Sequence, residues 1–298
     1  MADPEIVCVQ DARALVAEGP VWSVAEQVLW WINMGGEDQG PSLNRFNPAT
    51  EEAKTWPMQE QLGSVALADD GRVLIARRSG FYLFDPATAR ESLVAPTPCD
   101  LSVCEFNDGR CDAAGRFWVG TRFPRGGPPV PPGTGTLYSL ERGQVRRHDL
   151  GPVTLHNGTG FSPDGRRLYT TETFDGVIYV SDFDLARGEV SNRRVFAKLE
   201  KGGADGAAVD SQGGYWNANI LCGRIIRFLP DGSIDRIMPV PVTHPTMVAF
   251  GGRDLDELYI STAKRRLDAA GRAREPQAGG IFRCRVDVRG QEEPLYKV

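Results

Sequence analysis

Short runs of apolar residues alternate with polar turns along the whole chain and recur at a nearly constant interval. Six segments share one pattern, in which apolar residues precede a polar turn and a second run, rich in aromatic and β-branched residues, follows it. They occupy residues 21–33, 65–77, 110–121, 159–173, 207–219 and 248–262. The first strongly apolar residues after the turns lie 44, 44, 51, 47 and 43 residues apart: Leu29, Val73, Phe117, Leu168, Tyr215 and Leu258. This spacing predicts the four-stranded blades of a β-propeller.

A third apolar run follows in every unit, at residues 43–46, 81–84, 136–140, 177–180, 224–228 and 280–284. Asp-Gly pairs at 70–71 and 164–165 suit tight hairpins, because such turns need a positive φ. The pattern contains no sustained helical periodicity, so we predict an all-β protein. Six units use up the chain, and we expect residues 1–298 to form a single six-bladed propeller domain. We further expect residues 5–10 to pair beside residues 293–298 and close the ring, which would hide two strand edges.

The composition excludes several classes of protein. The 298 residues include 34 Lys and Arg against 39 Asp and Glu, a net charge of −5, whereas nucleic-acid and anionic-membrane partners favour a basic surplus. No apolar run approaches the roughly 18 residues of a membrane span, and the acidic start does not resemble a secretory signal. The six cysteines form no CxxC pair and the three histidines no HExxH motif, which argues against such zinc sites. We therefore expect a cytoplasmic protein, monomeric or weakly oligomeric, that binds neither nucleic acid nor membrane.

One repeat position carries oxygen-bearing side chains in four of the six units. Counting back ten or eleven residues from the reference residues of units one, three, four and five gives Glu18, Asn107, Asn157 and Asp205. The innermost strands of a propeller line its central channel, so these side chains should converge there. Two carboxylates and two amides in a channel would favour a cation such as Ca²⁺, Mg²⁺ or Mn²⁺ over a thiol-seeking metal. The alternative is that each side chain caps a strand end through an Asx turn or holds channel water.

Several longer motifs occur in order from about residue 14 to the C-terminus. They are Glu18-Gly19-Pro20-Val21-Trp22, Phe106-Asn107-Asp108-Gly109, Asn157-Gly158-Thr159-Gly160-Phe161-Ser162-Pro163-Asp164-Gly165, Asp205-Gly206-Ala207, Phe250-Gly251-Gly252-Arg253-Asp254-Leu255 and Gly279-Gly280-Ile281-Phe282. In these motifs the chain resembles the SMP-30/gluconolactonase/LRE-like family, which includes the regucalcin-like sugar lactonases. The resemblance implies a six-bladed propeller with one divalent metal ion (Ca, Zn, Mn, Mg or Fe) in the channel. It also implies Glu18, Asn157 and Asp205 as metal ligands, and Asn107 as a contact of the substrate or of a metal-bound water.

One position departs from the family pattern. Members with sugar-lactonase activity often carry Arg two residues before the equivalent of Asn107, where it meets substrate hydroxyls, but this chain has Glu105. An anion that only accepts hydrogen bonds replaces a cation that only donates them. We therefore expect Glu105 to contact substrate and to disfavour acidic lactones; the alternative is that it points to solvent. Arg122 is a further candidate substrate contact. It begins a proline-rich segment, ending at Gly135, that resembles the family's loop over the channel mouth; we expect a proline-stiffened lid there, and the alternative is a plain surface loop.

The function that we predict is hydrolysis of a small, sugar-type or related lactone to the hydroxy acid. The metal would act as a Lewis acid on the lactone carbonyl, Asn107 would orient the substrate, and Asp205 would take a proton from the attacking water. Because a metal-bound carboxylate is a poor base, a metal-activated water is the alternative. His156 is a candidate substrate contact and general acid or base, although no Ser/Asp partner stands at a triad spacing. The other readings are a metal-dependent esterase or phosphotriesterase on the same site, a strictosidine-synthase-like enzyme, and a non-catalytic calcium-binding propeller.

Overall fold

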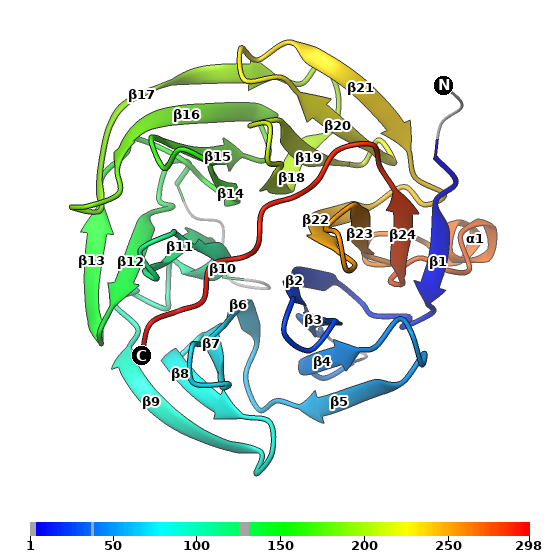
Figure 1. Cartoon of the computed structure of the whole chain (residues 1–298), viewed down its shortest axis with the longest axis horizontal. Helices are drawn as coiled ribbons and strands as arrows, with labels where there is room; N and C mark the ends of the chain where they lie inside the picture. The colour runs from blue at the N-terminus through cyan, green and yellow to red at the C-terminus, as the bar shows by residue number, and fades with distance from the viewer. Residues whose placement is uncertain (1–3, 37–38, 125–130) are drawn as a thin grey trace.

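The computed structural model describes residues 4–36, 39–124 and 131–298. In these residues the chain forms six four-stranded antiparallel sheets, which are arranged like blades around a central axis (Figure 1). The prediction of an all-β, six-bladed propeller is therefore confirmed. Within the same residues, no helix has both the length and the apolar character needed to span a membrane.

The first three blades each consist of four consecutive strands, ordered from the channel outward. Blade one contains β2 (Ala17–Ser23), β3 (Val28–Asn33), β4 (Ser42–Phe46) and β5 (Ala53–Pro57). Blade two contains β6 (Leu62–Leu67), β7 (Val73–Arg77), β8 (Gly80–Asp85) and β9 (Arg90–Pro96). Blade three contains β10 (Glu105–Cys111), β11 (Phe117–Arg122), β12 (Leu137–Glu141) and β13 (Gln144–His148).

The next two blades repeat this order, and the last one departs from it. Blade four contains β14 (His156–Phe161), β15 (Arg167–Glu172), β16 (Val177–Asp184) and β17 (Glu189–Lys198). Blade five contains β18 (Gly203–Val209), β19 (Tyr215–Ile220), β20 (Arg224–Phe228) and β21 (Ile234–Pro239). Blade six contains β22 (Pro245–Gly251), β23 (Glu257–Thr262), β24 (Ile281–Arg285) and, outermost, β1 (Val7–Gln10). A short helix, α1 (Ala269–Arg274), lies between β23 and β24.

The ring is closed by the N-terminal strand, because β1 pairs with β24 in an antiparallel ladder. The prediction that residues 5–10 pair with residues 293–298 is wrong. Since β23 occupies one edge of β24, only the other edge is open, and β1 takes it. The C-terminal segment instead crosses the propeller (red in Figure 1), where Tyr296 N donates a 2.8 Å hydrogen bond to Leu67 O. This segment therefore connects blades across the channel rather than extending an edge.

The hydrophobic core is divided among the interfaces between neighbouring blades. Each of six apolar clusters of described residues draws its side chains mainly from two adjacent blades. Between blades five and six, for example, Trp216 packs edge-on against Phe250 with ring centroids 5.8 Å apart. Because each sheet packs on both faces, inner strands such as β10 and β18 are buried along their whole length, whereas the outer strand β9 is largely exposed. Two-sided packing therefore holds the innermost strands in fixed positions around the channel.

Candidate active site

All six innermost strands share an irregularity at the repeat position that carries the polar residues. The pairing register with the second strand of the blade shifts there, as at a β-bulge, between Glu18 and Val21, Leu62 and Ser64, Phe106 and Gly109, Asn157 and Gly160, Ala204 and Ala207, and Pro245 and Met247. Bulges re-aim side chains and are frequent beside active sites. In β14 the bulge requires Gly158, which has a φ of +60° and where a Cβ would lie 2.3 Å from the Tyr215 hydroxyl.

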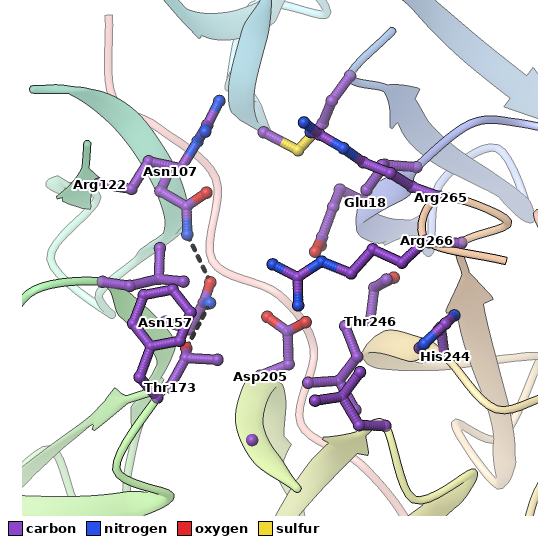
Figure 2. A pocket seen from close by; sticks show the side chains of 18 of the residues that line it. Glu18, Asn107, Arg122, Asn157, Thr173, Asp205, His244, Thr246, Arg265 and Arg266 are labelled. Carbon is purple, nitrogen blue, oxygen red and sulfur yellow. Dashed lines mark hydrogen bonds between the residues drawn. The ribbon is translucent and has the colours of Figure 1, made fainter. Parts of the chain in front are cut away.

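A pocket of about 240 Å³ lies where these innermost strands begin, and the four polar residues predicted to converge all line it (Figure 2). Asn107, Asn157 and Asp205 are more than nine-tenths buried, with 7%, 4% and 6% of their surfaces exposed. Glu18 reaches the pocket from β2 on the opposite side of the channel. The volume lies just below the usual range of ligand pockets, roughly 300–1,000 Å³. The pocket therefore suits a small ligand.

Hydrogen bonds fix the orientation of the two amides. Asn107 Nδ2 donates to Asn157 Oδ1 at 2.6 Å and to the backbone oxygen of His156 at 2.8 Å. Asn157 Nδ2 donates to Thr173 Oγ1 at 2.8 Å, and that hydroxyl donates to Ala204 O at 2.9 Å. As a result, Asn157 presents Oδ1 toward Asn107, and Asn107 has only its Oδ1 to offer a ligand.

The chemistry of the pocket residues fits a hard divalent cation. Glu18 and Asp205 supply carboxylate oxygens, and Asn157 Oδ1 keeps a second lone pair beyond the one that Asn107 occupies. Among the described residues, no three His, Cys, Asp or Glu side chains gather into a metal-binding group, and the amide oxygen of Asn157 is the donor that lies beside the two carboxylates in the pocket. An all-oxygen set of this kind favours Ca²⁺, Mg²⁺ or Mn²⁺ over a thiol-seeking metal.

Glu105 lies behind the pocket rather than on its surface. Arg122 is among the residues that line the pocket and Glu105 is not. The two side chains form an ion pair between Arg122 Nη2 and Glu105 Oε1, and both are about 95% buried, with 4% of Glu105 and 5% of Arg122 exposed. Burial lowers the pKa of Arg122 to about 10, against the opposing effect of Glu105, so the guanidinium stays charged at neutral pH. The expectation that Glu105 repels acidic lactones is not supported, because its charge is compensated by Arg122.

His156 does not present its ring to the pocket. A Cβ on Gly120 would lie 2.3 Å from the His156 Cβ, which places the side chain against β11 of the neighbouring blade. Its Nδ1 is buried without a hydrogen-bond partner in the described structure, and burial lowers the pKa of the ring to about 3. The imidazole is therefore neutral at physiological pH, and its position gives no support to an acid–base role.

Four polar side chains of blade six that we did not predict as site residues complete the pocket: His244, Thr246, Arg265 and Arg266. Thr246 is held by its Oγ1, which donates to Ala17 O at 2.6 Å. The two arginines belong to a basic run, Lys264-Arg265-Arg266, that is visible in the sequence. Only the fold shows that the two arginines face the pocket, because they follow β23 in a loop whose direction the strand pattern does not predict.

Apolar side chains form another part of the pocket wall. Phe123 stacks on Phe174 with ring centroids 5.9 Å apart, and Leu155 and Leu221 lie on the same lining. Phe123 belongs to the segment 122–135 that we predicted as a lid. Residues 125–130 of that segment lie outside the described residues, so the lid stays a prediction.

The chain was compared with known proteins by sequence and by structure. "6-Deoxy-6-sulfogluconolactonase" from Pseudomonas putida is 37% identical over 291 residues, which cover 97% of each chain. "L-Arabinolactonase" from Azospirillum brasilense is 33% identical over 276 residues, 91% of this chain and 89% of that protein. The crystal structure of a calcium-binding protein, regucalcin, from Agrobacterium tumefaciens superposes with a TM-score of 0.91 at 28% identity, covering 100% of this chain and 98% of the other.

A family model matches most of the chain. Residues 16–264 match the family described as SMP-30/Gluconolactonase/LRE-like region. This range contains every polar residue that was predicted to converge on the channel, and the resemblance inferred from the motifs is confirmed. The chain belongs to the SMP-30/gluconolactonase/LRE-like family.

Proposed function

We propose that this protein is a lactonase that hydrolyses a small sugar-type lactone to the hydroxy acid, supported by one divalent cation. The observation that carries the proposal is the convergence of Glu18, Asn107, Asn157 and Asp205 in one pocket. The names of the relatives support the substrate class, because one refers to a sulfonated gluconolactone and another to L-arabinolactone. Both are cyclic esters of sugar acids.

Each pocket residue has a role that its contacts allow. Glu18, Asn157 and Asp205 would hold the cation, which when bound supplies Lewis-acid stabilisation for the charge that develops on the lactone carbonyl oxygen. Asn107 uses both Nδ2 hydrogens inside the protein, so its Oδ1 would accept a hydrogen bond from a substrate hydroxyl. The Asp205 carboxylate would take a proton from the water that attacks the acyl carbon and return it to the ring oxygen as the C–O bond breaks. The Asp205 backbone is fixed for this task, because Asn217 Nδ2 donates to its carbonyl oxygen at 2.8 Å.

The test is a proton-release assay on a panel of lactones, with metal content measured in the same preparation. We expect the metal-loaded protein to hydrolyse glucono-1,5-lactone or arabinonolactone above the spontaneous rate. Prolonged chelation should abolish turnover, and adding back a divalent ion should restore it. Full activity in verified metal-free protein would overturn the cation's role, and no turnover of any lactone by metal-loaded protein would overturn the lactonase assignment.

A second candidate function, calcium binding without catalysis, has one observation in its favour. The Agrobacterium tumefaciens relative is described as a calcium-binding protein. The same preparation separates the two candidates. A protein that binds calcium in the pocket, loses that binding in Asp205→Ala and turns over no lactone would be a binding protein, whereas lactone turnover that is lost in the same variant supports the enzyme.

A further inference from the structure

The loop after β23 places two arginines in the pocket. Backbone hydrogen bonds hold this loop, because Arg265 N donates to Leu15 O at 3.1 Å and Leu267 N donates to Lys264 O at 3.2 Å. Arg266 has a φ of +71°, in the left-handed region that residues other than glycine rarely adopt. Both arginines line the pocket; Figure 2 shows Arg266 extending from blade six toward the carboxylates of Glu18 and Asp205, and Arg265 running along the other side of Glu18, away from Asp205. The loop therefore directs two guanidinium groups at the space where a ligand would lie.

The two guanidiniums differ from the third arginine of the pocket in their partners. Arg122 is paired with Glu105. Across the described part of the chain, by contrast, neither Arg265 nor Arg266 has a side-chain hydrogen bond or an ion pair. Arg265 also acts on Arg122, because its charge helps to lower the pKa of that guanidinium. The blade-six side of the pocket thus carries positive charge whose hydrogen-bond donors are not used by any other described residue.

Guanidinium groups with unused donors suit an oxyanion. Each presents a planar fork that binds carboxylate, phosphate or sulfonate oxygens through charge-assisted hydrogen bonds. A cation held by Glu18 and Asp205 would compensate those carboxylates and leave the arginine charges to act on the ligand. The pocket holds about 240 Å³, so one small molecule in it could contact both the bound cation and the arginines.

We propose that Arg265 and Arg266 bind an oxyanionic substituent of the substrate. The proposal rests on the lactonase function above and names its substrate class as lactones of acidic sugars. It reverses the expectation drawn from Glu105, since the charge of that residue is compensated by Arg122, whereas Arg265 and Arg266 line the pocket with positive charge. Arg265 and Arg266 are then specificity residues.

The kinetic test uses four lactones that differ only at C6: glucono-1,5-lactone and its 6-deoxy-6-sulfo, 6-phospho and 6-carboxylate counterparts. We expect kcat/KM for the best acidic lactone to exceed that of the neutral one by about tenfold or more, and the ranking identifies the oxyanion. In Arg265→Gln and in Arg266→Gln, the ratio of acidic to neutral kcat/KM should fall about tenfold or more, mainly through KM. The control is Arg274→Gln, an exposed arginine in the last turn of α1, which should keep the ratio. An equal loss for acidic and neutral lactones in the pocket variants would overturn the proposal.

A binding measurement distinguishes failure of this proposal from failure of the lactonase assignment. Calorimetry with gluconate and 6-deoxy-6-sulfogluconate, which cannot be hydrolysed, should show about tenfold tighter binding of the sulfonate, and the double variant Arg265→Gln/Arg266→Gln should lose that difference. If the wild type hydrolyses no lactone but keeps the difference, the arginine site stands and the lactonase function fails. If it hydrolyses neutral and acidic lactones alike and the difference is absent, the lactonase function stands and the arginine proposal fails.

Discussion

Glu105 and Arg122 are direct register partners on β10 and β11, and their side chains form a buried ion pair behind the pocket. The guanidinium also reaches the pocket surface, and its Nη1 donates to Phe123 O at 3.3 Å. The arginine that touches the ligand space is thus held by a carboxylate that does not. Glu105 is therefore a structural residue, because its removal would leave the charge of Arg122 buried without the carboxylate that compensates it.

The first prediction concerns the loss of stability when Arg122 is buried without Glu105. Glu105→Gln should lower the free energy of unfolding by about 3–5 kcal/mol, because removing one partner of a buried pair leaves the other charge buried and uncompensated. The double variant Glu105→Gln/Arg122→Met should recover much of the loss. Urea denaturation at pH 7 measures both. The control is Asp182→Asn, which breaks the half-exposed pair with Arg194 and should cost less than about 1 kcal/mol. Similar losses in the buried and exposed pairs would contradict the prediction.

A second prediction concerns Thr173 as a positioning residue. Thr173→Val removes the hydroxyl that accepts from Asn157 Nδ2, so the amide loses the contact that fixes its orientation. We expect the affinity for the divalent cation to fall about 10–100-fold, as for other groups that orient metal ligands, with rescue in Thr173→Ser. Thr171→Val is a matched control, because the Thr171 hydroxyl also donates to Ala204 O at 2.9 Å, whereas among the described residues the Asn157 amide donates to the hydroxyl of Thr173 and not to that of Thr171. Calorimetric titration of metal into each variant gives the answer. Equal losses in both valine variants would show that only packing around Ala204 is at stake.

The fold was largely predictable because its signal is repeated. Six units with the same turn and strand order indicate the blades, and the repeat position that bears Glu18 recurs at a bulge in every innermost strand. Ring closure carries no such signal. Residues 5–10 and 293–298 are single short segments of similar polarity, and which of them meets the open edge of β24 depends on how the whole ring closes. Local sequence therefore predicts the blades but not the strand that joins them.

The site was predictable only where it belongs to the repeat. Glu18, Asn107, Asn157 and Asp205 occupy equivalent strand positions, so their convergence follows from the fold. Arg265 and Arg266 lie in the connection between β23 and β24, which has no counterpart in the repeat pattern, and their direction is set by backbone contacts of the loop. Glu105 was interpreted without its partner, because the pairing with Arg122 depends on a bulged register. A charge pair between two strands, or the direction of a loop beside the channel, can therefore be identified only from the three-dimensional structure.

A third prediction concerns stability in acid and rests on His148. Its ring packs beside Trp118 with centroids 4.4 Å apart, and Nε2 lies 2.8 Å from Ser139 Oγ. Burial lowers the pKa of His148 from 6.5 to about 4, with smaller effects from the charges of Arg146 and Arg116. The folded protein therefore keeps the imidazole neutral well below the pH at which the unfolded chain protonates it.

Protonation of the unfolded state gives the direction of the effect. The free energy of unfolding should decline as the pH falls from 6.5 toward the pKa of His148 in the folded protein. Between pH 7 and pH 5, His148 should account for about 2 kcal/mol of this decline. In His148→Gln, which keeps a partner for Ser139, the decline over this range should be smaller by that amount. Urea denaturation at the two pH values measures it, and the imidazole proton shifts of His148 in the folded wild type should not titrate above pH 5. An unchanged decline in the variant would rule out this contribution.

The last prediction separates the two roles proposed for Asp205. Asp205→Asn keeps an oxygen of similar reach but removes a negative charge and the capacity to accept a proton. If the carboxylate only binds the cation, saturating metal should restore most of kcat, because the remaining defect is one of metal affinity. If it also accepts the proton of the attacking water, kcat should stay about 10²–10⁴-fold below the wild type at full occupancy. We expect the second result, because a carboxylate on the cation has a second oxygen to face the water, whereas an amide presents a hydrogen-bond donor there. The measurement is kcat on one lactone with occupancy determined independently, and near wild-type turnover at full occupancy would exclude the base role.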